Sequence, residues 1–136
     1  MIVVDTNLRF YLFADSDQSG LAEMVLEKDR DWQAPRLWRS EFRNALVKSV
    51  RNNFMDLRDA LRIAAVAELI MPDDKFDVAS DDVIELATSS GCTAYDAEFV
   101  VLARELRVPL VTTDRGLLEK FPETAVSPER FLAPKS

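Results

Sequence analysis

Residues 2–12 read Ile-Val-Val-Asp-Thr-Asn-Leu-Arg-Phe-Tyr-Leu, and this stretch decides the fold class. Ile2–Val4 is short and wholly apolar, as is typical of a strand that is buried on both faces of a sheet. Asp5 ends the apolar run, and from Leu8 onward apolar residues recur at helical spacing. A buried strand that passes directly into a helix indicates an α/β fold with a mainly parallel sheet.

The rest of the chain repeats this alternation of short apolar runs and longer helical patterns. We expect further strands at residues 32–34, 109–112 and 125–126. Helices are expected over residues 20–28, 35–51, 56–70, 80–89, 93–106 and 114–120, with a last one beginning at Pro128. Ser80 is expected to be the N-cap residue of its helix. A length of 136 residues predicts one domain, residues 1–136.

Two absences narrow the chemistry that the chain can perform. There is no histidine, which excludes Ser-His-Asp and Cys-His catalysis and histidine-ligated zinc. Cys92 is the single cysteine, which excludes an internal disulfide and favours a reducing compartment. No apolar run approaches the roughly 20 residues that span a bilayer, so we expect a cytoplasmic protein without a membrane segment. Carboxylates, hydroxyls, Lys, Arg and a metal ion that prefers oxygen ligands remain.

Two aspartates follow strands that are expected to end at the same edge of the sheet. Asp5 follows Ile2–Val4, and Asp114 follows the strand over residues 109–112. Ligands of open α/β sheets bind outside the carboxyl ends of the strands, so both carboxylates are candidates for a site. The alternative is that each aspartate only caps the helix that comes after it.

Asp96 and Glu41 are two further candidates. Asp96 ends the sequence Thr-Ala-Tyr-Asp at the start of a predicted helix, which also fits a capping box. Glu41 stands within the apolar stripe of the helix over residues 35–51, where an unpaired carboxylate loses its hydration at a cost in free energy. The alternative is a salt bridge from Glu41 to a nearby cation, for which the candidates are Arg39, Arg43 and Lys48.

Taken together, these acids can converge on one pocket at the carboxyl edge of the sheet. Carboxylates within a few ångström raise each other's pKa values, and a divalent cation removes that conflict. Mg²⁺ or Mn²⁺ suits a site without histidine, and such an ion activates water and neutralises a phosphodiester. Thr6, Asn7 and Thr112 stand beside the acids in the sequence. They can orient the carboxylates or make only local turn and cap hydrogen bonds.

Four motifs follow one another along the chain. They are Val3-Val4-Asp5-Thr6-Asn7, Ser40-Glu41-Phe42-Arg43-Asn44-Ala45-Leu46, Ala94-Tyr95-Asp96-Ala97-Glu98-Phe99-Val100-Val101-Leu102-Ala103 and Leu110-Val111-Thr112-Thr113-Asp114. Their order and separation resemble the PIN-domain nucleases, and most of all the small bacterial VapC-type toxins of toxin–antitoxin pairs. The resemblance covers essentially the whole chain, from Met1 to about Leu132.

The resemblance implies a three-layer α/β/α PIN fold with a central, mainly parallel sheet of four or five strands. It implies an endoribonuclease that depends on Mg²⁺ or Mn²⁺ and hydrolyses RNA phosphodiesters with an activated water. By motif, Asp5, Glu41, Asp96 and Asp114 would be the catalytic and metal-binding acids, and Thr112 would accompany the last of them. It also implies a homodimer and a VapB-type antitoxin as partner.

The net charge of −7 is unusual for a protein that binds RNA, because phosphates attract cations. RNA binding would therefore need a local basic surface, for which the candidates are Arg9, Arg36, Arg39, Arg43, Lys48, Arg51 and Arg115. The alternative for each of them is an ordinary solvated helix face. Trp38 and Tyr95 can stack on a base, although aromatic residues at helical spacing more often belong to the core.

Two other functions fit an α/β chain of this kind. A receiver-like Mg²⁺-binding module would need paired acids after the first strand and a lysine after a later one. Here the first strand is followed by Asp5 alone, and no lysine follows the strand over residues 109–112. A non-catalytic PIN scaffold is the second alternative, and the presence of all four motif acids argues against it.

Overall fold

The computed structural model describes residues 1–71 and 76–134. Within these ranges one sheet contains four strands, β1 (Ile2–Val4), β2 (Trp32–Gln33), β3 (Leu110–Val111) and β4 (Ala125–Val126). Their order is β2-β1-β3-β4, and every pairing is parallel. All strands therefore direct their carboxyl ends to the same edge, as the alternating sequence pattern predicted.

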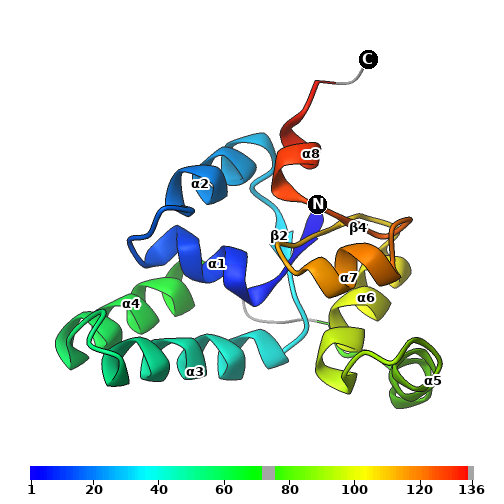
Figure 1. The fold of residues 1–136 in the computed structure, drawn as a ribbon, viewed down its shortest axis with the longest axis horizontal. Helices are drawn as coiled ribbons and strands as arrows, with labels where there is room; N and C mark the ends of the chain where they lie inside the picture. Colours follow the sequence, from blue (N-terminus) through cyan, green and yellow to red (C-terminus); the bar gives the residue numbers. More distant parts are fainter. Residues whose placement is uncertain (72–75, 135–136) are drawn as a thin grey trace.

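Helices cover this sheet on two sides. Those in the described ranges are α1 (Thr6–Phe13), α2 (Ser19–Lys28), α3 (Leu37–Arg51), α4 (Leu57–Ile70), α5 (Ser80–Ser90), α6 (Ala94–Leu106), α7 (Arg115–Lys120) and α8 (Pro128–Leu132). In Figure 1, α1 to α4 lie to the left of the strands and α5 to α7 lie to the right. The prediction of three α/β/α layers is thereby confirmed.

Polar side chains cap the starts of five of these helices, and three of the five are α1, α6 and α7. Asp5, Thr93 and Asp114 each accept a hydrogen bond from a backbone N–H in the first turn of α1, α6 and α7, respectively. Such N-cap bonds satisfy donors that have no partner within the helix. Two of the helix starts thus lie directly at the carboxyl edge of the sheet, after β1 and β3.

The start of α5 differs from the prediction. Ser80 is the first residue of this helix, and the N-cap residue is Ala79, whose side chain makes no cap hydrogen bond. The prediction that Ser80 caps α5 is therefore wrong. Asp81 and Asp82 lie in the first turn, where negative charge favours a helix start even without a hydroxyl cap. Gly91 terminates α5 with a left-handed φ of 80°.

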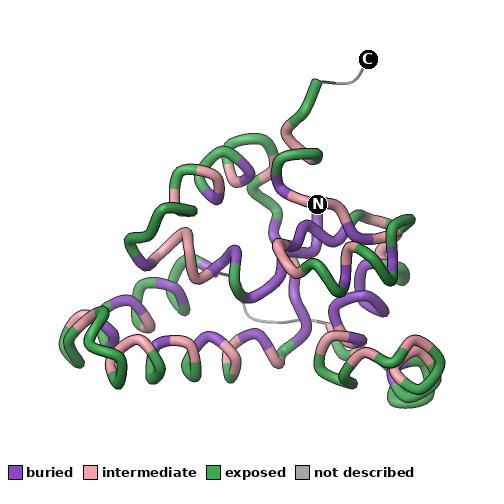
Figure 2. Tube along the Cα trace, in the orientation of Figure 1, coloured by how far each residue is buried: buried purple, intermediate pink, exposed green. Residues whose placement is uncertain are grey.

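The core lies around the sheet and the inner faces of α1, α3 and α6 (Figure 2). Val3, Val4 and Val111 in the central strands have no exposed surface. Helix α6 packs on both β1 and β3. This packing holds the two central strands, and hence the residues at their carboxyl ends, in fixed positions.

Arg9 belongs to this core, so the expectation that it contributes to a basic surface is wrong. Its side chain is 1% exposed. The guanidinium lies 5.3 Å from the ring of Trp38, and its Nε donates to the carbonyl of Val4 at 3.3 Å. The sulfur of Met71 accepts from Nη1 at 3.0 Å. Aromatic faces and backbone acceptors replace water around the charge, which sequence spacing does not reveal.

Helix α4 packs on α3 and leaves part of its apolar surface exposed. Ala60, Ile63 and Ala67 are buried, whereas Leu61 and Leu69 are 64% and 85% exposed. Over the described ranges, no helix is long and apolar enough to cross a bilayer.

Candidate active site

The four predicted acids line one cavity at the carboxyl edge of the sheet. Asp5 follows β1, Asp114 follows β3, Glu41 lies on α3 and Asp96 lies in the first turn of α6. The cavity has a volume of about 290 Å³. The other residues that line it are Thr6, Asn7, Asn44, Ala45, Lys48, Phe99 and Leu117. Side chains that lie up to 109 positions apart in the sequence are thus brought to one place.

Asp5 is the most deeply buried of the four acids, at 7% exposure. Its Oδ2 accepts from the hydroxyl of Thr112 at 2.5 Å and from the backbone N–H of Thr113 at 3.2 Å, while Oδ1 accepts from the N–H of Leu8 at 2.9 Å. Burial raises the pKa of Asp5, these hydrogen bonds lower it, and the charge of Asp114 raises it, with a net upward shift. Asp5 is therefore a helix cap and a cavity carboxylate at once.

Asp114 is tied to Asp5 through one side chain. The hydroxyl oxygen of Thr112 accepts from the backbone N–H of Asp114 at 3.0 Å, in addition to donating to Asp5. Asp114 Oδ1 accepts from the N–H of Leu117 at 3.0 Å. A methyl group on Gly116 would lie 3.1 Å from that same Oδ1, so the glycine leaves the carboxylate room.

Glu41 is held by a threonine rather than by a cation. The hydroxyl of Thr6 donates to its Oε1 at 2.7 Å. Arg39 and Arg43 instead extend to Glu68 on α4, at 3.8 Å and 3.3 Å. Within the described residues Glu41 has no salt bridge, so that alternative is wrong. Burial raises the pKa of Glu41, the bond from Thr6 lowers it, and nearby carboxylates raise it, with a net upward shift.

Asp96 completes the cluster from the first turn of α6. Its backbone N–H donates to the hydroxyl of Thr93 at 3.0 Å, as the capping-box pattern predicted. Burial raises the pKa of the Asp96 carboxyl, and the charge of Asp114 raises it further. A hydrogen bond of the Asp96 carboxyl with the Thr93 side chain and the charge of Lys120 lower this pKa, and the net shift is upward. The cavity carboxylates therefore influence one another electrostatically, as neighbours in one site do.

The oxygen donors of this cavity have the chemistry that Mg²⁺ and Mn²⁺ prefer. The carboxylates are partly buried and repel one another, so a bound cation would stabilise their ionised forms. Within residues 1–71 and 76–134, however, no three Asp, Glu, Cys or His side chains are close enough to hold one ion together. The acids line the wall of the cavity, where Thr112 and Thr6 hold two of them.

The remaining predictions about this region have different outcomes. Asn7 lines the cavity, as expected of a residue beside Asp5. Trp38 is 1% exposed and belongs to the core, so it is not available to stack on a base. Tyr95, the other candidate for base stacking, is 61% exposed because the first turn of α6 lies at the surface.

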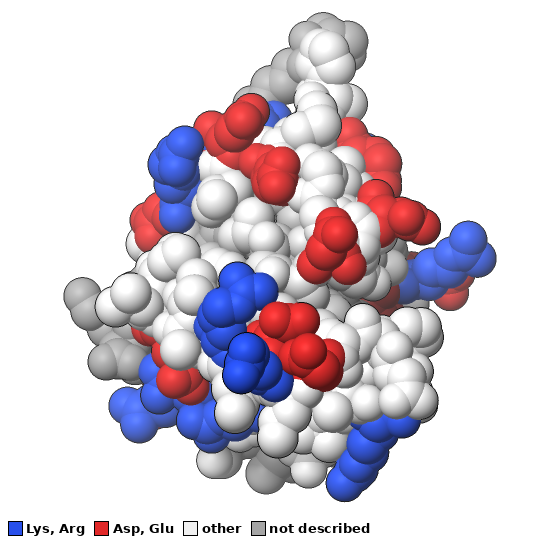
Figure 3. Space-filling view, turned by 90° about the vertical axis from the view of Figure 1, so that its left-hand side faces the viewer, with Lys and Arg blue, Asp and Glu red and all other residues white. Residues whose placement is uncertain are grey.

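Three of the arginines proposed for a basic surface lie in ion pairs with acids. Arg36 pairs with Asp77 at 3.2 Å, and Arg39 and Arg43 pair with Glu68. Basic and acidic side chains are interspersed on the face of the molecule that Figure 3 shows. Lys48, one of the predicted basic candidates, does line the cavity.

Sequence reasoning did not single out Asn44, which also lines the cavity. It lies three residues after Glu41, and Lys48 lies seven residues after it, so all three share one face of α3. The helical spacing from Glu41 is the sequence feature that could have identified Asn44 as a cavity residue.

Comparison with known proteins agrees with this geometry. The model of the PIN domain family matches residues 2–123. Ribonuclease VapC3 from Pyrobaculum aerophilum is 28% identical over 134 residues, which cover 89% of this chain and 95% of that protein. The crystal structure of PAE2754 from Pyrobaculum aerophilum superposes with a TM-score of 0.77 at 26% identity, covering 96% of this chain and 92% of that one.

Proposed function

The chain belongs to the PIN domain family, and on that premise we propose that it is an endoribonuclease that hydrolyses RNA phosphodiesters. The observation that carries the proposal is the convergence of Asp5, Glu41, Asp96 and Asp114 on one cavity. Its similarity to a VapC ribonuclease along most of both chains supports RNA as the substrate and the role of a toxin in a toxin–antitoxin pair.

Asp5, Glu41, Asp96 and Asp114 would hold Mg²⁺ or Mn²⁺ through carboxylate oxygens. Among the described residues no three acids are close enough to share one ion, so binding would require these side chains to move toward one another. When bound, such an ion lowers the pKa of water and stabilises the negative charge that develops on the phosphate. The mutual repulsion of the four carboxylates supports this assignment, because a cation relieves it.

The protein's own groups orient these acids. Thr112 and the N–H of Thr113 fix both the rotamer and the direction of the Asp5 carboxylate. Thr6 occupies Glu41 Oε1, and within the described residues Oε2 has no hydrogen-bond partner. Glu41 Oε2 is thus one of the carboxylate oxygens able to accept a proton from water in the cavity. Asn7 lines the same space and supplies an amide beside Asp5.

Cleavage by purified protein tests the proposal. Wild type with Mg²⁺ or Mn²⁺ should cut RNA into products with 5′-phosphate and 3′-hydroxyl ends, and EDTA should stop the reaction. Asp96→Asn should abolish cleavage and retain the circular dichroism spectrum, since the N-cap bond to Thr93 is donated by the Asp96 backbone. Full activity of the Asp96→Asn variant would overturn the site assignment. Intact metal binding without any cleavage would instead favour the non-catalytic scaffold.

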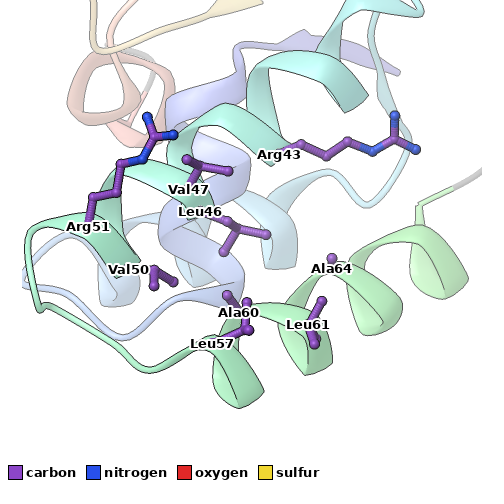
Figure 4. Close-up of a pocket in the computed structure, with 9 residues that line it drawn as sticks. All are labelled: Arg43, Leu46, Val47, Val50, Arg51, Leu57, Ala60, Leu61 and Ala64. Atoms are coloured by element: carbon purple, nitrogen blue, oxygen red, sulfur yellow. The ribbon is translucent and has the colours of Figure 1, made fainter.

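The proposed role also requires a partner surface. An apolar groove of about 320 Å³ runs between α3 and α4, floored by residues such as Leu46, Val50 and Ala60 and flanked by Arg43 and Arg51 (Figure 4). Exposed apolar patches commonly mark protein interfaces. The groove supports a protein–protein contact at this face, for which we propose a VapB-type antitoxin and a second copy of this chain as partners. The proposed cytoplasmic location follows from the proposed RNA substrate. Size-exclusion chromatography with light scattering, with and without the neighbouring gene product, tests both assemblies.

A further inference from the structure

One face of α3 extends the cavity beyond its carboxylates. Glu41, Asn44, Ala45 and Lys48 all line the cavity, and their spacing of three, four and seven residues places them on a single helix face. Seven residues of α-helix rise by about 10 Å. The polar wall therefore continues from the acids at Glu41 for two helical turns, to Lys48.

Lys48 differs from Arg39 and Arg43 on the same helix and from Arg36 just before it. Arg36, Arg39 and Arg43 are drawn to acids outside the cavity, namely Asp77 and Glu68. Lys48 is exposed and forms no ion pair within the described part of the chain. Of the described residues that line the cavity, it is the one with a positive charge.

Asn44 stands one turn before Lys48 and is also exposed. Its amide makes no hydrogen bond to other described residues. The fold thus depends on neither side chain, and both keep their donors available at the end of an acidic cavity. Amides and ammonium groups are common donors to the phosphate oxygens of nucleic acids.

We propose that Asn44 and Lys48 bind a phosphate of the RNA next to the one that is cleaved. This inference rests on the proposed function, because the carboxylates define where the cleaved phosphate lies. An acidic cavity repels the rest of an RNA strand, and a cation placed two turns along α3 offsets that repulsion for the neighbouring phosphate. Lys48 contributes charge and Asn44 contributes a neutral hydrogen bond, so the two contributions are separable by experiment.

The salt dependence of RNA binding separates the contribution of Lys48 from that of Asn44. A fluorescent 12-nucleotide single-stranded RNA of mixed sequence would be titrated with wild-type protein in EDTA, which prevents cleavage, at 50 to 200 mM KCl. Each neutralised phosphate contributes about 0.7 to the slope of log K against log salt. Lys48→Ala should reduce the magnitude of this slope by about 0.7. Between 50 and 200 mM KCl the variant should therefore lose roughly 2.5-fold less affinity than wild type loses. Lys48→Arg should restore the slope.

Asn44→Ala should weaken binding about fivefold, the usual effect of losing one hydrogen bond, with the slope unchanged. Arg58→Ala removes an exposed charge on α4, outside the cavity lining, and should change neither quantity. In Mn²⁺, Lys48→Ala should raise KM and leave kcat within about twofold.

A wild-type slope in Lys48→Ala, an equal loss of slope in Arg58→Ala, or no measurable binding by wild type would each overturn the proposal. Failure of the proposed function looks different. In that case wild type cuts no RNA in Mg²⁺ or Mn²⁺, whatever the slopes show in EDTA.

Discussion

The hydroxyl of Thr112 donates to Asp5 Oδ2 at 2.5 Å, across 107 residues of sequence. The same oxygen accepts from the backbone N–H of Asp114 at 3.0 Å. Thr112 has no exposed surface. It therefore sets the position of one cavity carboxylate and the backbone of another, although it does not line the cavity itself.

Thr112→Val should weaken the site more than the fold. Valine matches the shape of threonine but leaves Asp5 without one donor and the Asp114 N–H without its acceptor, at a cost of about 1–3 kcal/mol in unfolding free energy. Loss of such an orienting group typically lowers metal affinity or activity by about 10–100-fold. Mn²⁺ calorimetry and RNA cleavage measure both effects. Thr112→Ser keeps the hydroxyl, and activity as low as that of the valine variant would contradict this role.

Gly116→Ala should displace the Asp114 carboxylate. The new methyl group would meet Asp114 Oδ1 at 3.1 Å, so the cap bond to Leu117 or the carboxylate must shift. Because the gain in helix propensity, about 1 kcal/mol, offsets the weakened cap, we expect a small change in thermal midpoint and a severalfold lower Mn²⁺ affinity.

Gly20→Ala is the matched control for this substitution. Gly20 lies in α2, and nothing lies within 4 Å of a methyl group placed on it. The variant should gain about 0.5–1 kcal/mol of stability and retain the Mn²⁺ affinity of wild type. Equal Mn²⁺ affinities in the Gly116 and Gly20 variants would show that Asp114 is not constrained as described.

Glu41→Gln should stabilise the protein at neutral pH in EDTA. The pKa of Glu41 is raised above its ordinary value of 4.5 by burial, against the hydrogen bond from Thr6, and by neighbouring carboxylates. The folded state thus binds the proton more tightly than the unfolded state. The resulting stability is fully present below the unfolded pKa and is lost as pH rises through the folded pKa.

The glutamine variant removes this pH dependence. We expect a gain of up to about 1 kcal/mol at pH 7, a modest figure because solvent screens a half-buried group. Urea unfolding from pH 4 to pH 8 measures it. A wild-type advantage over Glu41→Gln that grows toward pH 8 would contradict the raised pKa.

Activity should fall on the acid side at a higher pH than ordinary carboxylates would dictate. Burial raises the pKa of Asp5, opposed by its hydrogen bonds, and burial with the charge of Asp114 raises that of Asp96. Cation binding requires the ionised forms, so protons compete as pH falls through these raised values. Increasing Mn²⁺ should therefore move the acid limb of the kcat/KM profile to lower pH. An acid limb that stays fixed at every Mn²⁺ concentration would argue against these ligands.

Much of the fold and the set of acids could be predicted because local patterns carry them. Ile2–Val4 is apolar at every position, which a strand buried on both faces requires. Asp5 and Asp114 follow strands of one parallel sheet, so their shared edge follows from topology. Both aspartates also cap helices, so helix capping and a place in the cavity are compatible explanations for them.

The errors concern contacts between elements, which spacing along the chain does not encode. The burial of Arg9 depends on Trp38 and on the carbonyl that ends β1. The orientation of Arg39 and Arg43 depends on Glu68, a residue of the neighbouring helix α4. The cavity position of Asn44 follows from Glu41 only once the inward face of α3 is known.

The most direct test of the central claim is calorimetric titration of Mn²⁺ into wild type and into four single variants. These are Asp5→Asn, Glu41→Gln, Asp96→Asn and Asp114→Asn, each first shown to be folded by circular dichroism. Glu105→Gln on the exposed side of α6 is the control. We predict that each of the four variants binds Mn²⁺ at least tenfold more weakly than wild type, whereas Glu105→Gln binds as wild type does. Wild-type affinity in the four folded variants would contradict the account.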